Sequence, residues 1–171
     1  MIMDVITAIL TRRSIRKYTG VPIKEDELKT IIEAGFYGPS AHNLRPMNFI
    51  VINETLQLEA IAKFHPYAKM LTQAGCGIVV CGDIKKQKRE GFLVEDCSAA
   101  IENMLLAAHS LNLGAVWCGL HPVKELTDGF TKLLNLPENI IPIGMVVVGN
   151  KDEEVQPLNR YDEAKIHYNN W

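Results

Sequence analysis

Hydrophobic residues recur along the chain with two spacings, which predict a mixture of amphipathic helices and short buried strands. Four apolar residues share one side of residues 4–11 and predict a short helix with one buried face. They are Val5, Ile6, Ile9 and Leu10. Residues 94–112 form the longest predicted helix, and its many small residues suit close helix–helix approach. Further helices are predicted at 24–34, 54–63, from Pro66 to about Gln73, and at 123–134, and strands at 49–52, 77–81, 115–118 and 143–148.

Charged residues and glycines suggest where these elements begin and end. Three acidic residues, at positions 25–27, fall in the first turn of the helix at 24–34, where they complement the helix dipole. Gly35 is the expected stop of that helix. Gly114 is expected to end the long helix at or near its own position through a left-handed backbone. Residues 38–46 carry two prolines, a serine and an asparagine, and are predicted to form a loop.

The alternation of helices and strands predicts one layered α/β sandwich. Repeats, low-complexity tracts and linkers are not visible, so residues 1–171 are interpreted as a single domain. The final segment, residues 150–171, is polar yet ends in His-Tyr-Asn-Asn-Trp. A segment too polar for its own core that carries aromatic residues needs a surface to pack on. We therefore expect it to lie across a partner subunit, with a frayed terminus as the alternative.

The overall composition is that of a globular protein, with 47% hydrophobic and 22% charged residues among 171. A net charge of −2 gives no reason to expect nucleic acid or an anionic membrane as a partner. The longest apolar stretches, such as residues 143–148, are far too short to span a bilayer. The first five residues show no basic region followed by an apolar core, so we expect no signal peptide and a cytoplasmic protein.

The cysteines and histidines do not have the spacing of metal or disulfide sites. No two cysteines form a C-x-x-C pair, and each lies in an apolar segment, which favours buried reduced thiols. The five histidines are scattered, so no metal site is expected. The cysteines are Cys76, Cys81, Cys97 and Cys118.

Residues 12–18, Arg-Arg-Ser-Ile-Arg-Lys-Tyr, concentrate four cations and a hydroxyl in one short stretch. A phosphate monoester carries about −1.5 to −2 charges at neutral pH, and arginine forks match its oxygens bidentately. The segment is therefore a candidate phosphate site. The alternative is a solvated charged surface, which charge alone would favour.

Two motifs in order, R-R-S-x-R-x-[FY] and then P-S-A-x-N-x-x-P, resemble the N-terminal pattern of the FMN-dependent nitroreductase family. Residues 95–108 resemble the family's central helix, which forms much of its dimer interface. Residues 113–120 resemble the strand and turn that face the flavin. The resemblance implies a three-layer fold with a mainly antiparallel central sheet, and a homodimer with two FMN sites at the interface.

Carried over by position, the resemblance implies the cofactor contacts of the basic segment. Arg12 and Ser14 would hold the FMN phosphate and ribityl chain, and Arg13 would contribute its side chain or backbone. Arg16 would lie near the pyrimidine edge of the ring, where a cation stabilises reduced flavin. Arg160 resembles the family's second phosphate-binding cation, with Lys151 a weaker candidate.

The ring contacts implied by the resemblance come from two other segments. One would belong to the partner subunit and close over the ring and ribityl chain, and it comprises Pro39, Ser40, Ala41 and Asn43. The other would line the opposite side, with a backbone N–H near Gly119 reaching the flavin N5, and it comprises Trp117, Cys118, Gly119 and Leu120. Arg45 and Met47 depart from the glutamine and tryptophan that the family often has, which affects substrate contacts at that edge.

The activity implied is a ping-pong oxidoreductase. NADH or NADPH would pass hydride to the flavin N5 and leave, and a nitroaromatic, quinone or similar electron-poor acceptor would then take the same place. The flavin carries the chemistry, so no side chain need act as acid or base. Two alternatives remain: an FMN carrier or sensor without significant turnover, and a phosphate-metabolite-binding or purely structural α/β protein.

Overall fold

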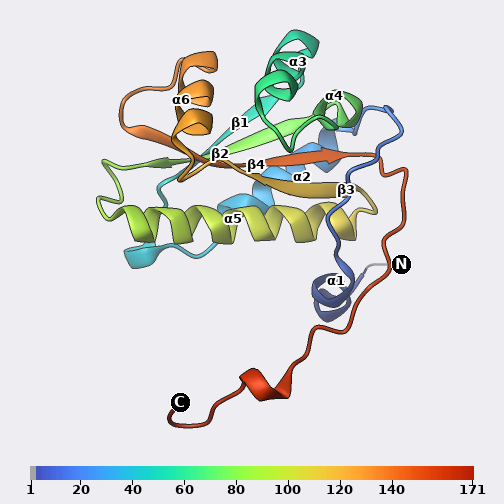
Figure 1. The fold of residues 1–171 in the computed structure, drawn as a ribbon, viewed down its shortest axis with the longest axis vertical. Coiled ribbons are helices and arrows are strands. Elements are labelled where there is room, and N and C mark those ends of the chain that lie inside the picture. Colours follow the sequence, from blue (N-terminus) through green and yellow to red (C-terminus); the bar gives the residue numbers. More distant parts are fainter. Residues whose placement is uncertain (1–2) are drawn as a thin grey trace.

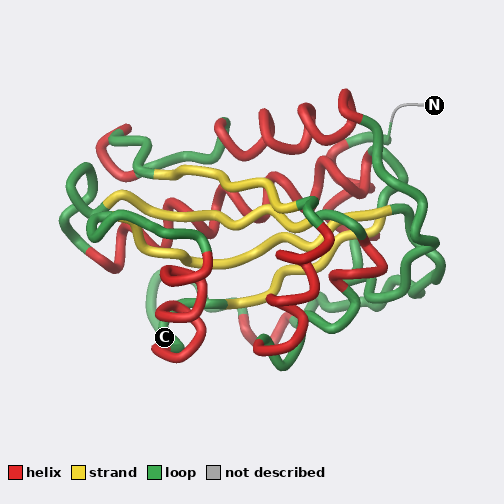
Figure 2. The backbone as a smooth tube through the Cα atoms, turned by 90° about the horizontal axis from the view of Figure 1, so that it is seen from above, coloured by secondary structure: helices red, strands yellow, loops and turns green. Residues whose placement is uncertain are grey.

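Four strands form one antiparallel sheet in the order β1-β2-β4-β3 in the computed structural model of this chain. Figure 2 shows the strands lying side by side, with helices above and below them. They are β1 (Met47–Ile52), β2 (Gly77–Asp83), β3 (Gly114–Gly119) and β4 (Ile140–Gly149). The structure describes residues 3–171. Residues 1–2 lie outside the described residues. They belong to the predicted domain and to the segment for which no signal peptide is expected.

Helices cover both faces of the sheet (Figure 1). One face carries α2 (Glu25–Phe36) and α5 (Glu90–Ser110), and the other carries α3 (Thr55–Phe64), α4 (Leu71–Ala74) and α6 (Lys124–Leu133). Between the layers lie two hydrophobic cores, one on each side of the sheet. On β2, Ile78 and Val80 enter the core beneath α5, whereas Val79 and Cys81 enter the opposite core, as the period-two alternation of a strand requires. The predicted three-layer fold with an antiparallel sheet is confirmed.

Two glycines expected to end helices do not do so. Gly35 lies inside α2, where a Cβ would come 2.9 Å from the Phe49 ring, so tight packing accounts for the glycine there. Gly114 is the first residue of β3. After α5 the left-handed position is taken by Asn112, with φ of 62°. Asparagine tolerates this conformation because its short polar side chain can hydrogen-bond locally.

The helix α1 (Val5–Thr11) forms as expected, but its predicted burial is wrong for a single chain. Asp4 caps the helix, accepting a hydrogen bond from the Thr7 amide at 3.1 Å. Within α1 only Ala8 is buried, and the four apolar residues expected inside are between 51% and 69% exposed. The helix lies outside the sheet and packs on one flank of α5, so the fold offers it too little surface to bury both sides.

The approach of α2 to α5 depends on small residues, as predicted. A Cβ at Gly38 would lie 2.9 Å from both the backbone nitrogen and the Cα of Ala100, so nothing larger than glycine fits. The helix α5 begins at Glu90, four residues before its predicted start. No helix in the described part of the chain is both long and apolar enough to cross a bilayer. The four cysteines are buried and unbridged, which confirms the prediction of buried free thiols.

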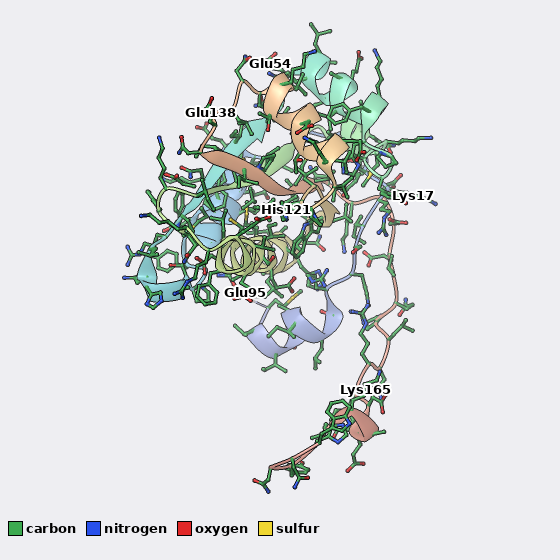
Figure 3. The ribbon with its side chains drawn as sticks, turned by 60° about the vertical axis from the view of Figure 1, so that its left-hand side comes forward. Lys17, Glu54, Glu95, His121, Glu138 and Lys165 are labelled. Atoms are coloured by element: carbon green, nitrogen blue, oxygen red, sulfur yellow. The ribbon has the colours of Figure 1, made fainter. Side chains whose placement is uncertain are left out.

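The chain leaves the body soon after β4 ends. Lys151 forms an isolated bridge with Tyr18, and residues 154–171 are then exposed throughout, including the short 3-10 helix η2 (Glu163–Lys165). Figures 1 and 3 show this tail running past α1 and away from the layered body, with Lys165 near its far end. The tail carries six exposed large hydrophobic side chains, at Val155, Leu158, Tyr161, Ile166, Tyr168 and Trp171.

Candidate functional site

The basic segment 12–18 runs beside the outer edge of β3. Ser14 pairs with Ala115 in a parallel bridge, and the Ile15 amide donates to the Ala115 carbonyl at 3.0 Å. Tyr18 is fully buried, and its hydroxyl donates to the Ile15 carbonyl at 2.7 Å. Ile15 and Tyr18 thus anchor the segment in the core, and its outward-facing residues lie along the strand edge.

Alternation along this segment separates the predicted phosphate contacts into two groups. Arg13 and Ile15 are buried, whereas the residues between and beside them, Arg12, Ser14 and Arg16, are less buried or exposed. The Arg13 guanidinium donates to the carbonyls of Leu10, Arg12 and Leu158 at distances between 2.5 and 3.4 Å. Its side chain is therefore committed to holding the end of α1 against the tail, and a ligand would meet Arg12, Ser14 and Arg16 instead.

The Arg12 side chain forms an ion pair with one residue of α5. Its Nε lies 3.3 Å from Oε1 of Glu102 on α5, and this nitrogen is buried without a hydrogen bond that meets normal geometry. Arg16 is exposed, and its backbone amide donates to Glu153 Oε1 at 2.5 Å. A guanidinium forms charge-assisted hydrogen bonds with anions, so Arg12 is a candidate phosphate contact at this edge.

The outer edge of β3 presents backbone donors next to these cations. The Ala115 carbonyl points away from β4 and accepts a hydrogen bond from the Ile15 amide. The backbone groups of successive residues in an antiparallel strand point alternately to its two sides, so those of Trp117 and Gly119 also point away from β4. A Cβ added at Gly119 would meet no atom within 4 Å. Gly119 therefore lies in open space, where a flat ligand can approach the backbone closely.

The four predicted residues of β3 and its turn, Trp117 to Leu120, are alternately exposed and buried. Trp117 is 38% exposed, and its indole Nε1 would be 2.4 Å from a Cβ at Gly144, so the ring lies close over the sheet backbone there. Cys118 and Leu120 are buried in the opposite core, so their side chains do not line the edge. Burial raises the pKa of the Cys118 thiol to about 11, partly opposed by the nearby Arg16 charge. The thiol is neutral at physiological pH.

The loop after α2 forms a second, separate part of the predicted site. A cavity of about 500 Å³ is lined by Phe36, Tyr37, Gly38, Pro39, Ser40, Asn43 and Arg45. Ser40 Oγ accepts from the Arg45 amide at 3.0 Å. The buried Asp96 on α5 accepts from the Ala41 amide at 2.7 Å, and its other oxygen has no partner in the described chain. This carboxylate fixes the loop against α5.

Within one chain the loop does not meet the basic segment. The loop contacts α5 at Asp96, whereas Arg12 contacts it at Glu102, six residues further on. At about 100° per residue the two contacts lie on flanks of α5 roughly 120° apart. Arg160 lies on the exposed tail, two residues after Leu158, whose carbonyl accepts from Arg13. The structure therefore unites the basic segment with β3 and leaves residues 39–43 facing elsewhere.

Two buried polar residues that support these segments were not predicted from the sequence. Asp96 anchors the loop, and His65, only 1% exposed, contacts the Gly119 carbonyl through Nε2 at 3.2 Å. Neither residue stands in a motif that reveals its contact, because each partner is a backbone group more than 50 positions away. The one signal in the sequence for Asp96 is an aspartate on an otherwise apolar helix face, because a buried carboxylate needs a hydrogen-bond partner.

Most of this chain is similar in sequence to known proteins. The sequence profile described as "Nitroreductase family" matches residues 9–69 and 55–150. A protein of Methanothermobacter thermautotrophicus, provisionally named NADH dehydrogenase/NAD(P)H nitroreductase, is 43% identical over 99% of this chain and 88% of its own length. The chain belongs to the nitroreductase family, a family of oxidoreductases.

Solved structures agree with this membership. A provisionally identified nitroreductase of Desulfovibrio desulfuricans, in complex with FMN, has a TM-score of 0.83 and 30% identity over 96% of this chain and 95% of its own. The NADPH:FMN oxidoreductase of Vibrio harveyi, complexed with NAD+, has a TM-score of 0.88 and 26% identity over 97% of this chain and 77% of its own. The fold is common to all three proteins.

Proposed function

We propose that this protein is an FMN-dependent NAD(P)H oxidoreductase that works as a homodimer. The observation that carries the proposal is the continuous edge formed by the basic segment and β3. Arg12 and Ser14 offer cationic and hydroxyl groups at one end of this edge, and Gly119 offers an open backbone donor at the other. Ser14 pairs with Ala115, and Gly119 lies four residues further along β3, about 13 Å away. A phosphate, a ribityl chain and the near side of a flavin ring fill such a span.

The chain's own residues would bind and orient this cofactor. Arg12 and Ser14 would hold the phosphate, and Arg160 would add a second cation from the nearby tail. Arg16, close enough to Cys118 to affect the pKa of its thiol, would place positive charge beside the ring. When bound, FMN supplies hydride transfer at N5, from NADH or NADPH and then to a nitroaromatic, quinone or similar acceptor, in two half-reactions.

The partner subunit would complete the site with Pro39, Ser40, Ala41 and Asn43, which face away from the basic segment of their own chain. Exposed apolar surface supports a dimer. Val5 and Ala8 of α1 border a cavity of about 460 Å³ between α1, α2 and α5, and the tail exposes large hydrophobic side chains between residues 155 and 171. Contiguous apolar surface of this kind marks an interface between proteins. We expect residues 150–171 to lie across the partner.

The first experiment is the visible absorption spectrum of the purified protein, followed by release and identification of the chromophore. FMN at about one per chain, with steady NADH or NADPH consumption on addition of a quinone, would support the oxidoreductase. FMN without turnover would favour the carrier or sensor. A colourless protein that is not stabilised against heat by added FMN would exclude both, and would leave the basic segment as ordinary charged surface.

The dimer has its own test, which is the molar mass in solution by light scattering. A mass of twice 19.1 kDa is expected for the full chain. A monomer that still holds FMN would contradict the proposed contribution of residues 39–43 from the partner.

A further inference from the structure

His65 lies between α3 and α4 and is almost completely buried. A buried imidazole has two polar nitrogens, and each must find a partner to offset the loss of water. Here both do. Nε2 lies 3.2 Å from the Gly119 carbonyl, and Nδ1 lies 3.2 Å from the Tyr67 amide.

These two partners define which nitrogen carries the proton. A carbonyl only accepts, so Nε2 must donate to Gly119. A backbone amide only donates, so Nδ1 must accept from Tyr67. His65 is therefore neutral, with its proton on Nε2. Burial lowers the pKa of His65, which keeps the ring in this neutral form, although the bond to Gly119 partly opposes the shift.

Gly119 needs such an anchor more than its neighbours do. It is the last residue of β3, it has no side chain to pack, and the space where a Cβ would stand is open. Glycine has more backbone freedom than any other residue, so its peptide groups are poorly fixed by the strand alone. A second contact supports the same junction, because the Cys118 thiol donates to the Tyr67 carbonyl at 3.5 Å. Residues 65–67 thus hold the end of β3 through two hydrogen bonds.

We propose that His65 is a positioning residue of the flavin site. Its Nε2–H holds the carbonyl of Gly119, which belongs to the peptide group after the Gly119 Cα. This bond restricts rotation about that Cα and so limits the directions that the Gly119 N–H, in the preceding peptide group, can take toward the place of the flavin N5. This rests on the proposed function. His65 is only 1% exposed, so in this proposal it acts through Gly119 and makes no contact with the cofactor.

A purely structural histidine would behave differently. The His65 ring also packs edge-on against Phe130 on α6, with centroids 6.4 Å apart. If packing were its whole contribution, an aromatic replacement would serve as well. The proposal instead requires a hydrogen-bond donor at the position of Nε2.

Three variants separate these readings. His65→Phe keeps the aromatic bulk and removes the donor, and His65→Gln places an amide N–H near the position of Nε2. Phe130→Leu disturbs the same core and leaves the donor in place. For each variant the FMN dissociation constant, the midpoint potential of the bound flavin and the urea midpoint would be measured on the full chain.

We expect His65→Phe to raise the FMN dissociation constant about tenfold, the equivalent of one hydrogen bond. We also expect a higher midpoint potential, because the Gly119 N–H would donate to N5 of oxidised flavin and would lose this acceptor once N5 is protonated. His65→Gln should restore both values to near those of the wild type. Phe130→Leu should lower the urea midpoint without changing the potential.

One readout does not depend on the cofactor. Two-bond ¹H–¹⁵N spectra of the flavin-free protein should show His65 protonated at Nε2, and the Gly119 amide signal should move in His65→Phe. The opposite tautomer, or flavin constants in His65→Phe equal to those of Phe130→Leu at matched stability, would overturn the inference. Wild-type protein that binds no FMN would instead refute the proposed function, and with it any flavin contribution of His65.

Discussion

Replacing Arg12 by alanine is the sharpest test of the phosphate site. The side chain is only 20% exposed and is oriented by Glu102, so little side-chain entropy would be lost when it meets a phosphate. The substitution would remove the two charge-assisted hydrogen bonds that we propose between Arg12 and the phosphate. Their loss should weaken FMN binding by about 2 to 4 kcal/mol, which corresponds to a dissociation constant roughly 30- to 900-fold higher.

The effect on folding should be small by comparison. The Arg12–Glu102 pair is partly exposed, and such pairs contribute at most about 1 kcal/mol. Arg12→Ala should therefore remain folded, with a urea midpoint close to that of the wild type. This separation makes the binding measurement interpretable.

Fluorescence titration of the flavin-free protein with FMN would give the dissociation constants. Lys17→Ala is the matched control, because it removes one positive charge from the same segment and Lys17 bonds through its backbone amide to Glu153. Binding in Arg12→Ala should also become less sensitive to salt. Wild-type affinity in Arg12→Ala, or an equal loss in both variants, would show that Arg12 makes no specific contact with the phosphate.

Three further outcomes are expected. Gly38→Ala should lower the free energy of unfolding by about 1 to 3 kcal/mol, since its Cβ would press on the Ala100 backbone, and urea denaturation measures this. Burial lowers the pKa of both His65 and His109 below 6.5, so the unfolded state binds more protons and stability should fall as pH drops below about 6.5, with no such effect above it. In His65→Phe that slope should be shallower. All four cysteines should resist a thiol reagent at pH 8 until urea unfolds the chain, since burial raises the pKa of each thiol, to about 11 for Cys118.

Local patterns predicted most elements because apolar spacing reflects which face is buried. The strand at 77–81 and the helix at 123–134 were placed to within two residues of β2 and α6. The failures came from glycines, from α1 and from the helix predicted from Pro66, because α4 begins only at Leu71. The Phe49 ring leaves no room for a side chain at Gly35, and this contact joins residues 14 positions apart. The prediction that Gly35 ends the helix, which used only its neighbours in sequence, was therefore wrong. The apolar face of α1 has no cover in one chain, and a periodicity does not reveal what covers it.

The sequence by itself determined the residue types that the site would use. The cations and the hydroxyl at 12–16, and a glycine at 119 two residues after a tryptophan, can be read directly from the sequence. It also determined the family, because several motifs recur in the same sequence order.

The tertiary structure alone decided which of these groups are accessible at the open edge of β3. Strand alternation turned Trp117 and Gly119 to the open edge and buried Cys118, and the anchoring of Ile15 and Tyr18 placed the cations beside that edge. It also brought His65 to Gly119 across 54 positions. Contacts of this kind are made between a side chain and a backbone carbonyl, and every residue has such a carbonyl. No pattern of side chains along the chain therefore specifies them.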